Sequence, residues 1–388
     1  MLIGREVTIL GGGIGGLAAA LALALRGARV RVLEQAPAIS EVGAGIQISP
    51  NGMVVLRALG LEPVIAASAP RATAVRLRDF RHGAQVAHLP LTRADRPYHF
   101  VHRADLIGAL GQAAEAAGVT ITLNSQVTAT ASGPDGARLT HADGRTESTP
   151  LLIGADGLRS VLRAALNPRS RPFFTGQVAW RCLIPSATPA PPEVQVFMGP
   201  GRHLVCYPLR DGHLINIVAV EERDAWAAEG WHHRDDPAHL RRAFTDFCPA
   251  VRDLLERADD VFLWGLCRHP VADLWHDDHS ALLGDAAHPT LPFLAQGANM
   301  ALEDAWVLAD CLANDPDQPA ALARYQSLRR LRCMRIVDAA SDNAANYHLH
   351  PGPYRLAAHT ALRAASRFAP HVLTNRFDWL YGHDVTAG

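Results

Sequence analysis

The chain contains no lysine: all 37 of its basic residues are arginine, in a sequence of 388 residues. The absence of lysine excludes Schiff-base chemistry and a lysine-containing Walker phosphate loop. A GxSxG nucleophile elbow is also missing, which argues against a hydrolase of that type. The net charge of −1 provides no bulk attraction toward nucleic acid or anionic membranes, so we expect neither as a partner.

Cysteine is scarce, and its six thiols are scattered singly with no CxxC motif. Such thiols are typical of a reducing compartment, so we predict a cytoplasmic protein. A hydrophobic content of 48% and a charged content of 19% indicate a globular chain long enough for two domains. The His- and Asp-rich segments 232–236 and 276–279 are polar and predict solvated surface, and we expect no metal.

Charge is absent from residues 7–25, VTILGGGIGGLAAALALAL, a run long enough for a membrane span or a secretory signal. Its internal pattern favours another interpretation. A β-branched run at 6–10 predicts a buried strand, a GxGxxG turn follows, and an Ala/Leu-rich helix leads to a second strand at 28–33. This order is the βαβ unit of a dinucleotide-binding domain, and we expect no integral membrane contact.

The four polar or glycine positions of this unit each have a physical role. Gly11 permits the tight turn, Gly13 lets the backbone approach a pyrophosphate, and Gly16 lets the helix pack closely on the strand. Glu34 ends the second strand, where its carboxylate can accept hydrogen bonds from a ribose diol. The motif alone is compatible with both NAD and FAD.

Two further motifs follow in chain order: LLIGADGLRSVLR at 151–163 and LLGDAAHPTLPFLAQGANMALEDA at 282–305. With GGGIGG and Glu34, they resemble the single-component FAD-dependent aromatic hydroxylases of the para-hydroxybenzoate hydroxylase superfamily. VAWRCLIP (178–185), GRHLVCYPL (201–209) and FDWLYGHD (377–384) look like the branch of salicylate hydroxylase, 3-hydroxybenzoate 6-hydroxylase and 6-hydroxynicotinate 3-monooxygenase.

The resemblance implies FAD as the cofactor and NADH or NADPH as a transient co-substrate, since the chain has no second Rossmann fingerprint. It implies that Asp285 hydrogen-bonds the ribityl chain and that Arg103 reaches the pyrophosphate. Asp156 is associated in the family with both FAD and the nicotinamide cofactor. The helix that begins near Gly297, Ala298 and Asn299 would direct its positive end at the flavin, where reduced flavin carries negative charge.

The order of elements predicts an α/β fold with a discontinuous Rossmann-like FAD-binding domain of the GR2 type and an inserted β-sheet-rich substrate domain. We assign 1–70, 98–172 and 268–340 to the FAD-binding domain. We assign 71–97 and 173–267 to the substrate domain, and 341–388 to a C-terminal helical segment.

His203 and Tyr207 are the candidate catalytic residues. They are four residues apart on a strand-like run, so their side chains face the same side. A histidine poised near neutral pH, aided by a tyrosine hydroxyl, can remove the proton of a phenol and make the ring electron-rich. From spacing alone, a His and a Tyr satisfied in a sheet core is the favoured interpretation; with the resemblance, the catalytic one is favoured.

Four residues are candidates for the substrate pocket: Gln47, Cys206, Pro289 and Gln296. Pro289 and Gln296 are expected beside the reactive edge of the flavin. The hydroxynicotinate enzymes tend to carry His where this chain has Gln47, which favours a benzenoid substrate. For Cys206, contact with substrate and core packing are both open. For His288, packing under the flavin loop is preferred over a hydrolase role.

The predicted function is hydroxylation of a small phenolic aromatic acid, of the salicylate or 3-hydroxybenzoate type, using NAD(P)H and O₂ through a flavin C4a-hydroperoxide. A hydroxypyridine hydroxylase of the 6-hydroxynicotinate type is an alternative. Alternatives of another class are a non-hydroxylating FAD oxidoreductase and a non-catalytic flavin-binding module. The oligomeric state stays open, with a homodimer as one candidate.

Overall fold

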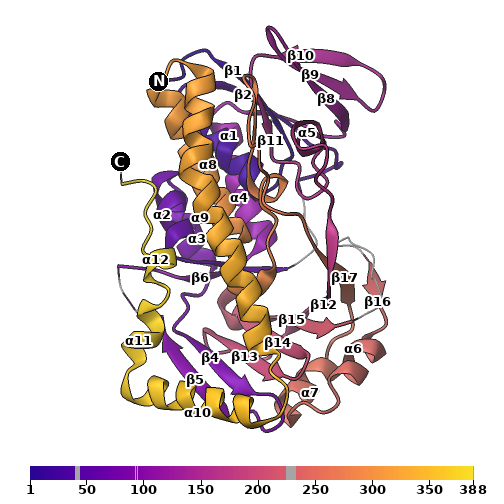
Figure 1. Ribbon diagram of the computed structural model, residues 1–388, viewed down its shortest axis with the longest axis vertical. Coiled ribbons are helices and arrows are strands. Elements are labelled where there is room, and N and C mark those ends of the chain that lie inside the picture. The colour runs from indigo at the N-terminus through magenta and orange to yellow at the C-terminus, as the bar shows by residue number, and fades with distance from the viewer. Residues whose placement is uncertain (40–43, 92, 94, 224–232, 388) are drawn as a thin grey trace.

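The computed structural model describes residues 1–39, 44–91, 93, 95–223 and 233–387. One end of the molecule is built on a five-stranded parallel sheet in the order β18-β11-β1-β2-β7 (Figure 1). Its strands are β1 (Glu6–Leu10), β2 (Arg29–Leu33), β7 (Thr120–Thr122), β11 (Leu152–Gly154) and β18 (Ser280–Leu282). They are short and mostly apolar, as expected for parallel strands covered on both faces.

The uncharged N-terminal run is a strand followed by a buried helix. After β1, helix α1 (Ile14–Ala24) buries nine of its eleven residues, so its leucines and alanines face protein almost all round. It packs against α4 (Arg103–Ala116) and α8 (Gly297–Asn314). Among the described residues, no helix combines the length and the apolarity needed to cross a bilayer.

The other end of the molecule is an eight-stranded mixed sheet in the order β16-β17-β12-β15-β14-β13-β4-β5. Its strands are β4 (Ala74–Asp79), β5 (Gln85–Pro90), β12 (Phe173–Pro185), β13 (Glu193–Gly199), β14 (Arg202–Leu209), β15 (Leu214–Glu222), β16 (Arg234–Asp235) and β17 (Val261–Arg268). Two chain segments therefore build one sheet, because β4 pairs in parallel with β13. Helices α6 (Pro237–Ala243) and α7 (Pro249–Glu256) pack together beside it.

Smaller sheets and helices accompany the two large sheets. β3 (Gly45–Ile48) pairs with β6 (His99–His102), and β8 (Val127–Gly133), β9 (Gly136–His141) and β10 (Thr146–Thr149) form a three-stranded antiparallel sheet. Short helices complete this part: α2 (Pro50–Ala58), α3 (Glu62–Ser68) and α5 (Val161–Leu166).

A long C-terminal helix joins the two sheets. α9 (Gln318–Tyr347) has 30 residues, which corresponds to about 45 Å, and it runs from the parallel sheet to the eight-stranded sheet (Figure 1). α10 (Pro353–Phe368) then packs against β5, and α11 (Pro370–Asn375) and α12 (Asp378–Tyr381) follow. The predicted fold class is confirmed: a Rossmann-like parallel sheet, a separate sheet-rich part and C-terminal helices. The domain boundaries stay a prediction.

Candidate functional site

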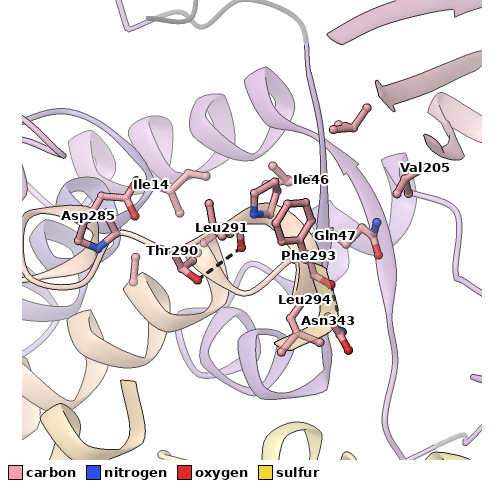
Figure 2. A pocket seen from close by; sticks show the side chains of 18 of the residues that line it. Ile14, Ile46, Gln47, Val205, Asp285, Thr290, Leu291, Phe293, Leu294 and Asn343 are labelled. Atoms are coloured by element: carbon pink, nitrogen blue, oxygen red, sulfur yellow. Dashed lines mark hydrogen bonds between the residues drawn. The ribbon is translucent and has the colours of Figure 1, made fainter. Parts of the chain in front are cut away.

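A cavity of about 1440 Å³ lies between the two sheets. Its lining begins at the GxGxxG turn and Glu34 and ends on one face of the eight-stranded sheet. Figure 2 shows Asp285 at one end of the drawn residues and Val205 of β14 at the other, with Ile46 and Phe293 between them. The cavity therefore connects the dinucleotide-binding elements with the wall that carries the candidate catalytic residues.

The glycine turn before α1 is shaped by backbone contacts. Gly11 has a φ of +98°, and a Cβ built on it would lie 2.5 Å from the carbonyl oxygen of Ala155. A Cβ on Gly16 would overlap the carbonyl oxygen of Gly11. Gly13 caps α1 and lines the cavity, and a Cβ there meets nothing within 4 Å. This open space before a helix N-terminus fits a phosphate group.

Glu34 lies at the carboxyl end of β2, beside that turn. Its two carboxylate oxygens accept hydrogen bonds from the N–H groups of Gly12 at 2.6 Å and Ala36 at 2.8 Å. These bonds fix the orientation of the carboxylate, and a carboxylate has further lone pairs that can accept ribose hydroxyls. Glu34 lines the cavity, as its predicted role requires.

Three charged residues predicted to contact the cofactor line the same cavity: Arg103 at the start of α4, Asp156 and Asp285. Oδ2 of Asp156 accepts from Val161 N–H at 2.8 Å, whereas its buried Oδ1 has no hydrogen-bond partner among the described residues. Asp285 is accessible from the cavity but surrounded by protein, and this burial raises its pKa against the opposing effects of His288 and Arg103. The donor and acceptor set fits a dinucleotide cofactor such as FAD.

The start of α8 contributes differently at each predicted position. Gly297 and Ala298 line the cavity. Asn299 is fully buried, and its side-chain amide donates to the carbonyl oxygens of Gln47 and Ala295 at 3.0 and 2.8 Å. The side chain of Asn299 therefore holds β3 against α8, and its contribution to a cofactor would come from its backbone N–H at the positive helix end.

His203 lines the cavity with a ring that is only 1% exposed. Its Nδ1 lies 2.6 Å from Nε2 of His348, and Nδ1 of His348 lies 2.6 Å from an Oε1 oxygen of Glu222. The rings of Phe293 and Tyr347 pack on it, each with centroids 5.2 Å away. Burial, with a smaller effect of His348, lowers the pKa of His203 well below its usual value. The ring is therefore neutral at pH 7. This differs from the expectation of a histidine with a pKa near neutral pH.

Tyr207 lines the same cavity but does not partner His203. Its hydroxyl lies beside Gly45, Gln47 and Asn216. Burial raises the pKa of Tyr207, opposed by Arg181 and by the contacts with Gln47 and Asn216, so the hydroxyl is protonated. Gln47 also lines the cavity and accepts a hydrogen bond from Tyr98 at 2.8 Å. Tyr207 and Gln47 thus belong to one polar group, and His203 to another.

The other predicted pocket residues divide into two groups. Pro289 lines the cavity. Cys206 faces the opposite side of β14 and packs in a core with Phe80 and Cys248, because neighbouring strand residues alternate in direction. Of the two open interpretations of Cys206, the structure therefore favours core packing over contact with substrate.

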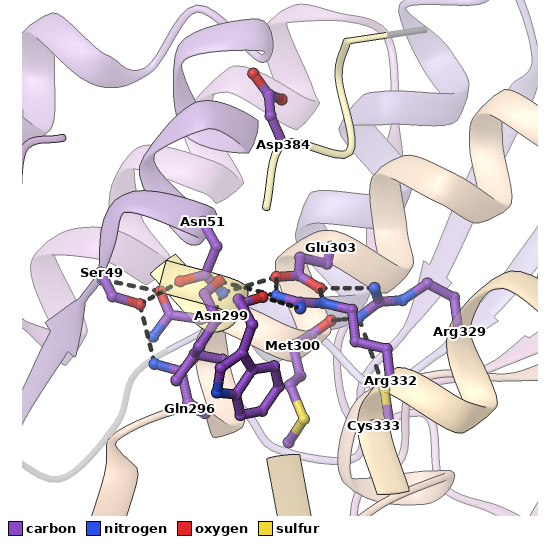
Figure 3. A network of polar contacts seen from close by, with 12 residues as sticks. Ser49, Asn51, Gln296, Asn299, Met300, Glu303, Arg329, Arg332, Cys333 and Asp384 are labelled. Carbon is purple, nitrogen blue, oxygen red and sulfur yellow. Dashed lines mark hydrogen bonds and ion pairs between the residues drawn. The ribbon is translucent and has the colours of Figure 1, made fainter. Parts of the chain in front are cut away.

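Gln296 also differs from the expectation. It is 1% exposed and lies outside the cavity lining, with its amide nitrogen donating to Ser49 at 3.0 Å and its oxygen accepting from Asn51 at 3.1 Å. It occupies the N-cap position of α8, but its side chain makes no capping hydrogen bond. Gln296 was expected at the flavin edge. Its hydrogen bonds instead direct its side chain toward a buried polar network (Figure 3).

This network is ionic, and the side chains of its acidic members and of Arg329 are buried, whereas that of Arg332 is 11% exposed. Glu303 pairs with Arg329 at 2.6 Å and with Arg332 at 2.8 Å (Figure 3). Arg329 also pairs with Asp304 at 2.8 Å. His288 lies 2.5 Å from the other oxygen of Asp304. Ligand atoms of His288, Asp304 and Cys333 lie within 4.8 Å of one another, but Arg329 already balances Asp304. His288 thus packs below the cavity, as preferred from the sequence.

Sequence reasoning missed His348 and Glu222. They lie 145 residues after and 19 residues after His203, and no motif or periodicity links such positions. Arg181 was also missed as a separate residue, although it lies within the quoted VAWRCLIP segment and lines the cavity. The alternation of side-chain direction along β12 is the one signal that could have placed Arg181 on the same wall as His203.

A glycine turn that opens into a cavity shared with a large sheet defines a dinucleotide-binding enzyme with a separate substrate wall. The family model described as "FAD binding domain" matches residues 5–340. The chain belongs to this family and, within it, to the flavin-dependent aromatic hydroxylases, as predicted. It is similar to 3-amino-4-hydroxybenzoate 2-monooxygenase of Streptomyces cremeus, with 37% identity over 99% of this chain and 96% of that protein.

Two further similarities cover nearly the whole chain. 3-Hydroxybenzoate 6-hydroxylase 1 of Aquipseudomonas alcaligenes is 33% identical over 98% of each chain. A solved salicylate hydroxylase substrate complex has a TM-score of 0.82 and 25% identity, over 98% of this chain and 96% of that one. The predicted family branch is therefore confirmed, and the chain is a flavoprotein monooxygenase of this branch.

Proposed function

We propose that this chain hydroxylates a small phenolic aromatic acid, of the salicylate or 3-hydroxybenzoate type, with NADH or NADPH and O₂ as co-substrates. The observation that carries the proposal is a neutral, buried His203 on the wall of a cavity that also contains the dinucleotide-binding turn. By their names, the two curated relatives act on 3-amino-4-hydroxybenzoate and 3-hydroxybenzoate. Both of these compounds carry a ring hydroxyl and a carboxylate.

The wall supplied by the sheet suits such a compound. Val194, Val196 and Val218 make it apolar, and Arg181 is a cation set into it, with Cζ 4.4 Å from the Trp264 ring centroid. Arg181 binds the carboxylate of the aromatic acid, because a guanidinium matches a carboxylate in charge and geometry. His203 lies two strands away, on the same face, where it meets the ring hydroxyl.

His203 accepts the proton of that hydroxyl at Nε2, since Nδ1 is occupied by His348. The resulting phenolate is more electron-rich than the phenol and reacts faster with an electrophile. Tyr207 remains protonated and orients the ring together with Gln47. Phe293, Leu294 and Val205 keep water from the reacting atoms.

Residues of the glycine turn, with Glu34, Asp156 and Asp285, hold FAD. When bound, FAD would supply the redox chemistry, namely electron uptake from NAD(P)H and activation of O₂ for transfer of one oxygen atom to the ring. The positive end of α8, at Gly297 and Ala298, stabilises negative charge on the reduced cofactor.

The test is to purify the protein, record its flavin spectrum and follow NADH and NADPH oxidation with 3-amino-4-hydroxybenzoate, 3-hydroxybenzoate, salicylate and 6-hydroxynicotinate. Products and hydrogen peroxide are identified for each compound. We expect one of the benzoates to raise the oxidation rate and to be hydroxylated. A preference for 6-hydroxynicotinate would favour the hydroxypyridine alternative. Flavin without any aromatic-stimulated oxidation would favour a non-hydroxylating oxidoreductase.

The variant His203→Gln tests the assigned base. We expect it to keep its flavin and to lose about 10²- to 10⁴-fold in hydroxylation rate at neutral pH, which is the usual contribution of a general base. His213→Gln, at an exposed histidine, is the matched control. Normal hydroxylation by His203→Gln would remove the base from the proposal.

A further inference from the structure

Three side chains form a continuous hydrogen-bonded line from the cavity to the protein surface. His203, at the cavity, is 1% exposed, and the side chain of His348 is 3% exposed. The side chain of Glu222 is 47% exposed, so its carboxylate meets solvent. Both links measure 2.6 Å, which is short enough for proton transfer along hydrogen bonds.

The direction of each hydrogen bond follows from the chemistry of the last partner. A carboxylate only accepts, so Nδ1 of His348 carries the proton that it donates to Glu222. A neutral His348 then has a bare Nε2, which accepts from Nδ1–H of His203. In this tautomer, His203 has a bare Nε2, the nitrogen that acts as a base. The carboxylate of Glu222 at the surface therefore determines, through His348, which nitrogen of His203 carries the proton.

Backbone hydrogen bonds hold the three residues in register. The N–H of Gly201 donates to the carbonyl oxygen of His348 at 3.3 Å, and the N–H of Glu222 donates to the carbonyl oxygen of Gly201 at 2.9 Å. Gly201 has a φ of +63° in the turn before β14, a conformation that favours glycine. The turn thus joins the end of α9, the start of β14 and the end of β15.

We propose that His203, His348 and Glu222 form a proton relay that carries the proton of the bound aromatic hydroxyl from the buried wall of the cavity to solvent. The inference rests on the proposed function, because it needs a ligand that loses a proton at His203. His348 and Glu222 act through His203 and are positioning residues.

The relay balances as three linked transfers. The substrate O–H bond breaks as an N–H bond forms at Nε2 of His203. The Nδ1–H bond of His203 breaks as one forms at Nε2 of His348, and the Nδ1–H proton of His348 moves to Glu222 and then to water. Both rings stay neutral, and His203 is left donating Nε2–H to the phenolate oxygen. No oxidant or reductant takes part.

The charged surroundings are consistent with this path. Tyr347 of α9 faces His203, and burial raises the pKa of its hydroxyl to about 12, so it is neutral. Burial lowers the pKa of His348, with Glu222 opposing and His350 adding to the effect.

The test uses the FAD-loaded oxidised enzyme without NAD(P)H, mixed rapidly with whichever benzoate of the panel is hydroxylated. The ultraviolet absorbance of the bound phenolate reports the proton leaving the ligand, and a pH-indicator dye reports its arrival in solvent. In Glu222→Gln we expect both signals to slow by at least about tenfold in weak buffer, with unchanged equilibrium affinity for the ligand.

Glu221→Gln is the matched control, because Glu221 is the adjacent residue and pairs with Arg223 at 2.7 Å. We expect it to behave as wild type, and Glu222→Asp to recover part of the rate. His348→Gln, which keeps a polar side chain but has no second tautomer, should slow the signals as Glu222→Gln does. Wild-type proton release in Glu222→Gln would overturn the relay and leave the proposed function intact.

A second readout needs no ligand. Imidazole nitrogen NMR of histidine-labelled holoenzyme, assigned with His203→Gln and His348→Gln, should show the Nδ1–H tautomer for both rings. Loss of that preference for His348 in Glu222→Gln, but not in Glu221→Gln, is expected. The Nε2–H tautomer at His203 in the wild type would contradict the relay even if no aromatic compound of the panel binds.

Discussion

Two histidines in this molecule are almost equally buried but differ in protonation: His203 is neutral and His288 is protonated. His203 is 1% exposed and His288 is not exposed at all. Burial lowers the pKa of His203 well below its usual value. Burial also acts to lower the pKa of His288, but Cys333 and the Asp304 carboxylate outweigh it, and the pKa of His288 is raised well above its usual value.

The two pKa shifts differ in direction because the nearest carboxylate lies at a different place relative to each ring. Asp304 contacts His288 directly at 2.5 Å, and its carboxylate favours the protonated form of that ring. Glu222 is separated from His203 by His348 and is half exposed, so its charge is screened by water. One site is therefore a rigid ionic support beneath the cavity, and the other keeps a neutral base available at its wall.

The largest expected effect comes from breaking the ionic site. In Arg329→Met, Glu303 and Asp304 lose a buried guanidinium that lies 2.6 and 2.8 Å away, so we expect the free energy of unfolding to fall by about 3–5 kcal/mol. The adjacent Arg330→Met is the control, because Arg330 pairs with a largely exposed Asp273 and such a pair contributes about 0–1 kcal/mol. Denaturant unfolding with FAD in excess measures both; equal losses would contradict the comparison.

The pH dependence of stability should separate the two histidines. The lowered pKa of His203 means that the unfolded chain binds an extra proton below its usual pKa, so stability is lost on acidification. The raised pKa of His288 gives stability that is present at low pH and is lost as pH rises through that pKa. Each slope is at most about 1.4 kcal/mol per pH unit.

We therefore expect His203→Gln to flatten the acid side of the stability curve, and His288→Gln to flatten the alkaline side while lowering stability overall. Denaturant unfolding from about pH 5 to about pH 9 measures both slopes. If the two variants changed the same side of the curve, their protonation states would not be opposite.

The smallest effect concerns the two faces of β14. Cys206→Ala should cost about 1 kcal/mol of stability and leave the KM for the aromatic substrate unchanged, because its side chain lies in the core. Val205→Ala, one residue earlier and facing the cavity, should weaken substrate binding by about 1 kcal/mol or more. A raised KM in Cys206→Ala would place that thiol back at the substrate.

Local spacing was sufficient for much of this protein. The close approach of Gly16 to Gly11 and the bond between Gly12 and Glu34 lie within one βαβ unit, so the sequence spacing predicts them; Gly11 also meets Ala155, which the tertiary structure brings to it. The common face of His203 and Tyr207 follows from the two-residue period of a strand. The same period predicts that Cys206 faces away from them, although contact with substrate was kept open for it.

Only the tertiary structure decided what these residues touch. Gln296 turns to Ser49 and Asn51, nearly 250 residues earlier, and His203 meets His348, 145 residues later. Gln296 directly precedes α8 and His348 directly follows α9, so the packing of these two helices brings both residues to their partners. No periodicity in the sequence predicts that packing. The charge of a buried histidine was undecided for the same reason. That charge depends on the carboxylate that the fold brings to the ring. The sequence separations of His288 from Asp304 and of His203 from Glu222 match no motif that would have predicted these contacts.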